Sequence, residues 1–322
     1  IREALLEKAA QGVEIRILYD AMGCRSVGKH FWKEMEKQGI HVAVFFPALF
    51  GRLHLRVNYR NHRKIAVIDG KVAYVGGFNI GKEYIGLDPK FGHWRDTHLR
   101  ICGSAVGGLL LRYIQDWDYA ARENLFENPK YFILPEEKAG NVKMQIISSG
   151  PDSELQSIRD NYLRLIHKAK KSIYIQTPYF IPDESILDAL KIAAKSGVDV
   201  RIMIPCKPDH PFVYWATYSY IGEMVAAGAK CYVYNNGFLH AKTLSIDGMV
   251  ACVGTANMDF RSFGLNFEVN AVIYSERTVQ RLERAFENDM TLCTQVTRKV
   301  YDERGLVIKA KEQFSRLLSP LL

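Results

Sequence analysis

The chain has 322 residues, of which 48% are hydrophobic, and its formal net charge is +8. This length and composition exclude a disordered chain and predict a large buried core, in two packed units rather than one. The positive charge favours a polyanionic partner but does not choose between nucleic acid, anionic lipid and a phosphorylated substrate. The six cysteines show no CxxC pair and no Cys/His cluster with zinc-ligand spacing, which argues against a zinc site.

The first predicted element is an amphipathic helix that is already under way at Ile1 and leads into an apolar strand ending near Asp20. Because the sequence starts within this helix, we expect a fragment of a longer protein, whose amino-terminal targeting or membrane segment lies outside it. No window within the chain approaches the roughly 18 consecutive apolar residues of a membrane-spanning helix.

A second strand is predicted over residues 38–46, and the segment that follows it mixes apolar residues with arginines. This segment, residues 47–61, reads PALFGRLHLRVNYRN. Leu49, Phe50, Leu53 and Leu55 beside Arg52 and Arg56 suit a surface that dips into anionic lipid, and an ordinary connecting loop explains the same residues equally well.

The most informative feature is an internal repeat. Residues 62–79 read HRKIAVIDGKVAYVGGFN, and residues 240–257 read HAKTLSIDGMVACVGTAN, so the two copies align without a gap. The identical positions are His62 and His240, Lys64 and Lys242, Asp69 and Asp247, Gly76 and Gly254, and Asn79 and Asn257.

The likeness between the copies extends upstream, where GVEIRILYD in the first copy parallels GVDVRIMIP in the second. The second copy also contains KKSIYIQTPYFIP at residues 170–182, a strand for which the first copy has no counterpart. The repeat predicts an α/β fold of two homologous halves, residues 1–140 and 141–322, each a mixed sheet flanked by helices. The turn-forming stretch LPEEKAGNV lies near their boundary.

Within each copy, an Asp-Gly pair between two apolar runs predicts a β-hairpin with a two-residue turn. Asp69 and Asp247 are therefore expected to shape turns rather than perform chemistry, as structural residues of the motif together with Gly76 and Gly254. Counting back from a two-residue turn places Gly77 opposite His62 and Thr255 opposite His240. Small residues there would leave room for a ligand, which makes Gly77 and Thr255 candidate substrate-binding residues.

Residues two apart in a strand share a face, so each copy presents its histidine and its lysine together. Asn79 and Asn257 follow each hairpin as amide donors. If the halves pack about a pseudo-twofold axis, two imidazoles, two ammoniums and two amides gather around one anion. A phosphodiester fits, because its oxygens accept from cations and amides while its phosphorus takes a nucleophile.

This pair of HxKxxxxD motifs, each followed by a glycine and an asparagine, resembles the phospholipase D superfamily over nearly the whole chain. Within that superfamily, three stretches are similar to bacterial cardiolipin synthases: GTANMDFRSFGLNFEVN, the TPYFIPD segment from Thr177, and GGFNIG followed by WRDTHLRI. The resemblance implies catalytic roles for His62, Lys64, Asn79, His240, Lys242 and Asn257. It also implies an acid that orients each histidine, which we match within each half: Asp96 with His62, and Glu268 with His240.

The resemblance further implies a mechanism that uses no cofactor and no metal. His62 is expected to attack the phosphorus of phosphatidylglycerol while His240 protonates the departing glycerol, and a second phosphatidylglycerol then takes the phosphatidyl group to give cardiolipin. The expected partners are this anionic phospholipid and a membrane surface, with no nucleic acid, and the full-length protein is expected at the bacterial cell membrane. Neither the oligomeric state nor the acyl preference is predicted.

Two other functions remain open. A hydrolase or nuclease of the same superfamily would use water as the acceptor, and the positive charge is compatible with it. A non-catalytic scaffold that binds anionic lipid or nucleic acid is disfavoured, because binding alone does not need both imidazoles, and both are present.

Aromatic residues in the second half are further substrate-binding candidates. Tyr179 lies in the TPYFIPD segment, and Phe212, Tyr214 and Trp215 follow a predicted strand in HPFVYWATYSY. The aromatic residues of HPFVYWATYSY form either an apolar wall for the lipid or the core-facing side of a helix. The terminal run KAKEQFSRLLSPLL is amphipathic and basic, and it either docks on its own half or touches a membrane; we favour docking.

Overall fold

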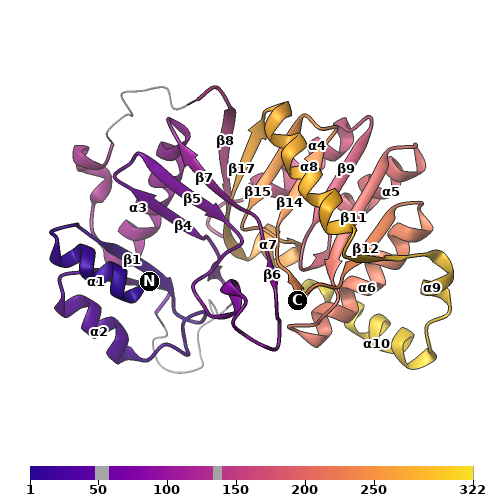
Figure 1. Cartoon of the computed structure of the whole chain (residues 1–322), viewed down its shortest axis with the longest axis horizontal. Helices are drawn as coiled ribbons and strands as arrows, with labels where there is room; N and C mark the ends of the chain where they lie inside the picture. The colour runs from indigo at the N-terminus through magenta and orange to yellow at the C-terminus, as the bar shows by residue number, and fades with distance from the viewer. Residues whose placement is uncertain (48–57, 133–139, 322) are drawn as a thin grey trace.

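The computed structural model describes residues 1–47, 58–132 and 140–321, and it has a mixed α/β architecture of two sheet-containing halves side by side (Figure 1). The residues between 48 and 57, on which the lipid-contact hypothesis mainly rests, lie outside the described part. So does most of the LPEEKAGNV stretch near the predicted boundary.

The second half is built on one large mixed sheet. Its strands follow the order β18-β12-β11-β9-β14-β15-β17, and β8 also pairs with β17. The bounds are β8 Lys143–Ser149, β9 Ser172–Gln176, β11 Asp199–Pro205, β12 Lys230–Tyr234, β14 Thr243–Ile246, β15 Val250–Gly254, β17 Asn266–Tyr274 and β18 Cys293–Val296. The strands β9, β11 and β12 are mutually parallel, and the other pairings among these strands are antiparallel.

Helices cover both faces of this sheet because its strands bury apolar residues on alternate sides. In β9, Ile173 and Ile175 face the core formed with α4, α5 and α6, whereas Tyr174 faces the core formed with α8. The helices are α4 Ser157–Lys168, α5 Glu184–Lys195, α6 Pro211–Ala226 and α8 Glu276–Met290.

The first half has a related plan without a counterpart of β9. A parallel pair, β1 (Arg16–Asp20) and β2 (His41–Phe45), is separate from the antiparallel sheet of β4 (Ile65–Ile68), β5 (Val72–Gly76) and β7 (His98–Cys102). In the second half, β9 joins the corresponding two groups. The prediction that the first copy lacks this strand is thus confirmed for the described residues. The helices here are α1 Arg2–Ala10, α2 Lys29–Lys37 and α3 Ala105–Ala121.

The halves share a hydrophobic core where their sheets meet. Ala73 and Val75 of β5 and Leu109 of α3 cluster with Val269 and Ala271 of β17. The helix α3 approaches β8 closely at Gly108, where a Cβ would lie 3.0 Å from the Ile146 side chain. This arrangement agrees with the predicted packing of two homologous halves (Figure 1).

The carboxy-terminal segment docks on the second half, as predicted. It contains α9 (Arg298–Asp302) and α10 (Leu306–Leu317), and α10 packs against α6. Short 3₁₀ turns complete the chain: η1 Glu83–Ile85, η2 Leu125–Glu127, η3 Pro129–Tyr131 and η4 Ser319–Leu321. Among the helices of the described ranges, none is both long and apolar enough to cross a bilayer.

Candidate active site between the two halves

Two short parallel strand pairs join the halves at the repeated motifs. The strand β3 (Arg60–Asn61) pairs with the start of β17, and β13 (Phe238–Leu239) pairs with β6 (Trp94–Arg95). The register continues one residue further, because His62 N–H donates to Phe267 O at 3.0 Å and His240 N–H donates to Arg95 O at 2.8 Å. Each histidine therefore lies beside the acid-bearing strand of the opposite half.

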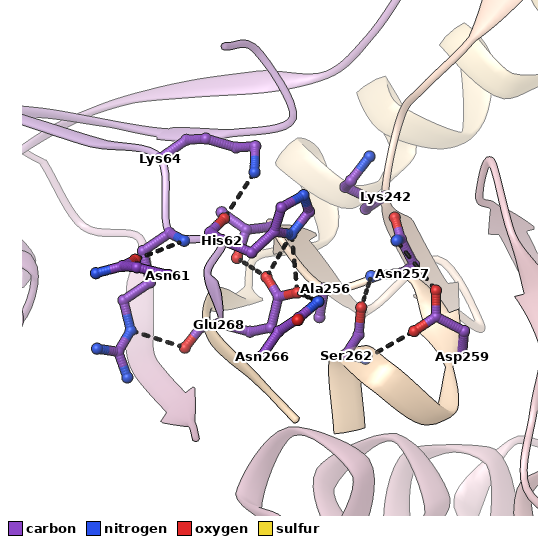
Figure 2. Close-up of polar contacts among 12 residues, drawn as sticks. Asn61, His62, Lys64, Lys242, Ala256, Asn257, Asp259, Ser262, Asn266 and Glu268 are labelled. Atoms are coloured by element: carbon purple, nitrogen blue, oxygen red, sulfur yellow. Dashed lines mark hydrogen bonds and ion pairs between the residues drawn. The ribbon is translucent and has the colours of Figure 1, made fainter. Parts of the chain in front are cut away.

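The histidine–acid pairs are consequently crossed. His62 Nδ1 lies 2.8 Å from Glu268 Oε1, and His240 Nδ1 lies 2.9 Å from Asp96 Oδ2 (Figure 2 shows the first pair). The expectation that each acid orients the histidine of its own half was wrong. A carboxylate at Nδ1 fixes that nitrogen as the donor and leaves Nε2 for chemistry.

The two lysines adopt equivalent positions. Lys64 Nζ donates to His62 O and Lys242 Nζ donates to His240 O, both at 2.7 Å. In Figure 2 the free edge of the His62 ring points into the space between the two ammonium groups. The predicted gathering of imidazoles and ammoniums is therefore observed, since the charge of Lys242 also acts on His62 and that of Lys64 acts on His240.

Both acids are held by additional donors from their own half. Glu268 accepts from the Thr255 hydroxyl at 2.5 Å and from Asn266 Nδ2 at 3.3 Å. Asp96 accepts from its neighbour Thr97 N–H at 2.8 Å and from Trp94 Nε1 at 3.3 Å. Both acid side chains are completely buried, so these donors hold the carboxylates that orient the histidines.

The hairpins confirm the predicted turn but not the predicted register. Asp69 and Gly70 both have positive φ, at 53° and 64°, as the Asp-Gly signal requires. However, Ile68 pairs with Val72, so Lys71 adds a third residue to the loop and shifts the pairing by one. The second hairpin does the same, with Ile246 opposite Val250.

This shift corrects the roles predicted for Gly77 and Thr255. Neither lies opposite a histidine as a space for substrate. A Cβ at Gly77 would lie 2.0 Å from Asp96 Oδ1, and Thr255 is fully buried against Glu268. Both residues instead support the orienting acids, one by leaving space for a carboxylate and the other by donating to one.

The other residues of the motif are structural, in agreement with the prediction. Asp247 accepts from the N–H groups of Lys170, Lys171 and Ser172 at 2.7 to 2.9 Å, which fixes the start of β9 against the turn. A Cβ at Gly76 would lie 2.4 Å from Thr97 O, and one at Gly254 would lie 2.4 Å from Val269 O. Only glycine lets these neighbouring strands approach so closely.

The two asparagines differ from each other. Asn257 is buried near Lys242, and its Nδ2 donates to Asp259 Oδ2 at 3.1 Å (Figure 2). Asn79 is exposed, and its Nδ2 donates to the Tyr84 hydroxyl at 2.7 Å. Each side-chain amide has a second N–H, and contact of that group with a bound phosphate stays a prediction.

Burial lowers the proton affinity of all four motif bases, and repulsion by a motif lysine adds to this at His62, Lys64 and His240. Burial, with the charge of Lys242, lowers the pKa of His240 to about 3. Burial also lowers the pKa of His62, against the attraction of Glu268. The pKa of Lys64 falls to about 7 and that of Lys242 to about 8, chiefly through burial. An anion that enters the site would stabilise the protonated forms of these bases.

The aromatic candidates separate into two groups. Tyr179 donates its hydroxyl to Asp209, and together with Tyr214 these residues line a small hollow. Phe212 and Trp215 lie at the contact between α6 and α10, where Lys311 Nζ is 5.4 Å from the Trp215 ring. This stretch is helical, but Phe212 is 51% exposed and Tyr214 and Trp215 are half-buried, so the interpretation that they face the core is not confirmed. Substrate binding by these aromatic residues and by Tyr179 stays a prediction.

Sequence reasoning missed several neighbours of the histidines. The Trp94 ring centroid lies 5.0 Å from that of His240, and Tyr84 lies 6.1 Å from it. Asp259 orders the backbone beyond the second motif by accepting from Ser262 N–H at 2.7 Å. Trp94 and Asp259 do lie within the quoted WRDTHLRI and GTANMDFRS stretches, so proximity to the motif was an available signal.

No three histidine, cysteine or acidic side chains in the described ranges are grouped as metal ligands would be. The charge that faces an anion comes from Lys64 and Lys242.

Comparison with known proteins agrees with this geometry. A family model described as "Cardiolipin synthase, PLD-like domain" matches residues 1–88 and 162–290. Cardiolipin synthase from Oceanobacillus iheyensis is 53% identical over 322 residues, and the major cardiolipin synthase ClsA from Bacillus subtilis is 54% identical over 323 residues. In both cases the alignment covers 100% of this chain and 67% of the relative.

A solved structure shows the same fold. Phosphatidylserine synthase from Haemophilus influenzae superposes with a TM-score of 0.68 at 14% sequence identity, covering 100% of this chain and 93% of the other. This likeness extends over both halves, and at such low identity it concerns the fold alone.

Proposed function

The chain belongs to the PLD-like family of cardiolipin synthases, and on that premise we propose that it transfers a phosphatidyl group between two phosphatidylglycerol molecules, giving cardiolipin and glycerol. The observation that carries the proposal is the pair of imidazoles, each held at Nδ1 by a buried acid of the opposite half. Binding of an anion needs cations, whereas two oriented imidazoles suit a nucleophile and a proton carrier.

In the first step, His62 Nε2 attacks the phosphorus of phosphatidylglycerol and the bond from phosphorus to the glycerol oxygen breaks. His240 donates a proton to that oxygen, so glycerol leaves as a neutral alcohol and a phosphatidyl-histidine remains. Lys64 and Lys242 supply positive charge to the non-bridging oxygens as the negative charge develops.

In the second step, the primary hydroxyl of another phosphatidylglycerol gives its proton to His240 and attacks the same phosphorus. The bond from phosphorus to nitrogen breaks, which restores His62 and releases cardiolipin. The protons balance, because the one that His240 gives to glycerol is replaced by the one from the acceptor.

The assignment of His62 as nucleophile rests mainly on the family resemblance. It is supported by accessibility, because the His62 side chain is 28% exposed and that of His240 is 11% exposed. An attacking nitrogen must reach phosphorus directly, which suits the more open ring.

The proposal also covers where the full-length protein lies in the cell. Both substrates are bilayer lipids, so we place the full-length protein at the bacterial cell membrane, with an anionic phospholipid as its partner and no role for nucleic acid.

The test is to incubate the protein with phosphatidylglycerol vesicles and to resolve the products. We expect cardiolipin and glycerol in equal amounts, no product from His62→Ala or His240→Ala, and normal product from a control substitution at exposed His30. Phosphatidic acid as the only lipid product would show that water is the acceptor and that the protein is a hydrolase. Vesicle binding without turnover would favour the scaffold.

A further inference from the structure

The helix α10 packs in an unusual orientation. Its fully buried side chains are the polar Glu312 and Ser315, whereas four large apolar side chains of the same helix face solvent. These are Leu306, Val307, Phe314 and Leu317, with exposed fractions of 84%, 68%, 58% and 80%. A helix of a soluble protein ordinarily buries its apolar stripe.

Specific polar contacts hold this orientation. Arg304 donates to both carboxylate oxygens of Glu312, at 2.8 and 2.7 Å, and Arg316 donates to Ser219 Oγ of α6 at 3.1 Å. The apolar face is thus turned outward by paired charges on the inner face. Single exposed apolar residues are common on protein surfaces, but four on one helix form a patch.

A second apolar segment belongs to the first half. Between β5 and β6, Ile80, Ile85 and Leu87 are 77%, 70% and 67% exposed. The corresponding segment of the second half, which contains β16 (Met258–Asp259) and α7 (Phe260–Gly264), is packed inward, with Met258 and Phe263 both 3% exposed. The repeat thus provides an internal reference, and only the first copy turns this segment outward.

The two segments lie along the same edge of the molecule. In Figure 1 the chain leading into β6 and the helix α10 both extend along the lower edge, below the sheets. The first of these segments borders the active site, and α10 packs on α6. Tyr84 contacts Asn79, and its ring meets the rings of Trp94 and His240 edge-on. The ring centroids of Phe212 of α6 and Phe314 of α10 lie 6.4 Å apart.

The charges beside these apolar residues are mainly positive. The only acid of α10 is Glu312, which is buried, whereas Lys311 is exposed and Lys309 is half-buried. In the first-half segment Lys82 and Lys90 are exposed, whereas Glu83 is half-buried and the carboxylate of Asp88 accepts from the backbone of residue 90 at 2.8 Å. Apolar side chains bordered by cations match the interfacial region of an anionic bilayer.

We propose that residues 80–87 and 306–317, here called the docking face, insert their apolar side chains into the headgroup region of an anionic lipid bilayer. In this orientation the active site, which the segment 80–87 borders, opens onto lipid headgroups, and a phospholipid reaches His62 without leaving the membrane. The inference rests on the proposed function for its substrate class, and it adds the surface through which that substrate is reached.

The experiment compares two double variants with a matched control. Leu306→Glu with Leu317→Glu disrupts one end of the docking face, Ile85→Glu with Leu87→Glu disrupts the other, and Ile192→Glu changes a 61% exposed residue of α5. Binding is measured by flotation with vesicles of equal parts phosphatidylglycerol and phosphatidylcholine. Activity is measured on these vesicles and on monomeric dihexanoyl phosphatidylglycerol.

We expect each double variant to partition at least tenfold less onto the vesicles, because burial of one such side chain is alone worth roughly tenfold. Vesicle activity should fall with binding, while activity on the monomeric lipid and the behaviour of the control stay unchanged. Two results would overturn the proposal. One is that both double variants partition onto vesicles as the wild type does. The other is that the wild type is a dimer that either double variant dissociates, because the docking face would then be a subunit interface. Failure of the proposed function is a separate result, in which the wild type binds vesicles but forms no cardiolipin from either lipid.

Discussion

The crossed pairing of acids and histidines makes a specific prediction about two conservative substitutions. Glu268→Gln should impair His62, and Asp96→Asn should impair His240, although each acid belongs to the half of the other histidine. Each substitution preserves side-chain shape and removes one negative charge. The two variants should therefore slow different steps of the same reaction.

The magnitude follows from the hydrogen bonds that are lost. The Glu268 carboxylate is completely buried, and it accepts from His62 Nδ1 at 2.8 Å as well as from Thr255 at 2.5 Å. A hydrogen bond to a charged group contributes about 1.5–3 kcal/mol, which corresponds to roughly 10- to 150-fold in rate when it holds the reactive tautomer. In Glu268→Gln, one of the two carboxylate oxygens is replaced by an amide NH₂ group. This group is a donor, so it cannot accept a hydrogen bond from His62 Nδ1.

The assay uses a phosphatidyl ester with a good leaving group, such as p-nitrophenol, whose departure needs no proton. Glu268→Gln should lower the burst rate of p-nitrophenol release by about 10- to 150-fold. Asp96→Asn should leave the burst nearly intact and slow turnover of phosphatidylglycerol, which does need an acid. The opposite pattern, with the burst lost in Asp96→Asn and kept in Glu268→Gln, would refute the crossed pairing as the functional arrangement.

Three further predictions concern charge and packing. Replacement of Lys64 or Lys242 by alanine should lower kcat/KM by roughly 10²-fold or more, and a chelator should have no effect on the wild type; loss of activity with rescue by added metal would contradict this. The affinity of the site for sulfate, measured by calorimetric titration, should fall between pH 6 and 9. Sulfate keeps a constant charge over this range, whereas Lys64 and Lys242, with pKa values of about 7 and 8 in the empty site, lose theirs. Thr255→Val should lower the free energy of unfolding by about 1–3 kcal/mol in urea, because it leaves the buried Glu268 short of one donor, and an unchanged midpoint would argue against that role.

The sequence was sufficient for the repeat, the two halves and the conformation of the hairpin turns. Asp69 and Gly70 have the positive φ values that an Asp-Gly pair favours, because this preference is local. The register beyond the turn was not predictable in the same way. Lys71 joins the loop without changing the turn itself, so nothing within the motif distinguishes a loop of two residues from one of three.

The crossed acids were mispredicted because proximity along the chain suggested partners from the same half. The true partners are decided by the parallel pairing of β3 with β17 and of β6 with β13, which forms only when the halves pack together. No residue pattern encodes the pairing of such short strands. The roles of Gly77 and Thr255 depended on the same unseen contacts.

The helix α10 illustrates a different limit. Its amphipathic pattern predicted docking, which the structure confirms, but the pattern also implies an inward apolar face. The observed helix is reversed because Glu312 pairs with Arg304, eight residues earlier in the sequence. An ion pair of this kind is not visible as periodicity.

The central claim is a covalent phosphatidyl-histidine formed at one position of a two-histidine site, and peptide mapping tests it most directly. His240→Ala is mixed with the p-nitrophenyl phosphatidyl ester, quenched under alkaline conditions that preserve phosphohistidine, digested and analysed by mass spectrometry. The account predicts a phosphatidyl adduct on His62 and none in His62→Ala. An adduct on His240 in the wild type would reverse the roles, and cardiolipin formation with no adduct on either histidine would contradict the covalent mechanism.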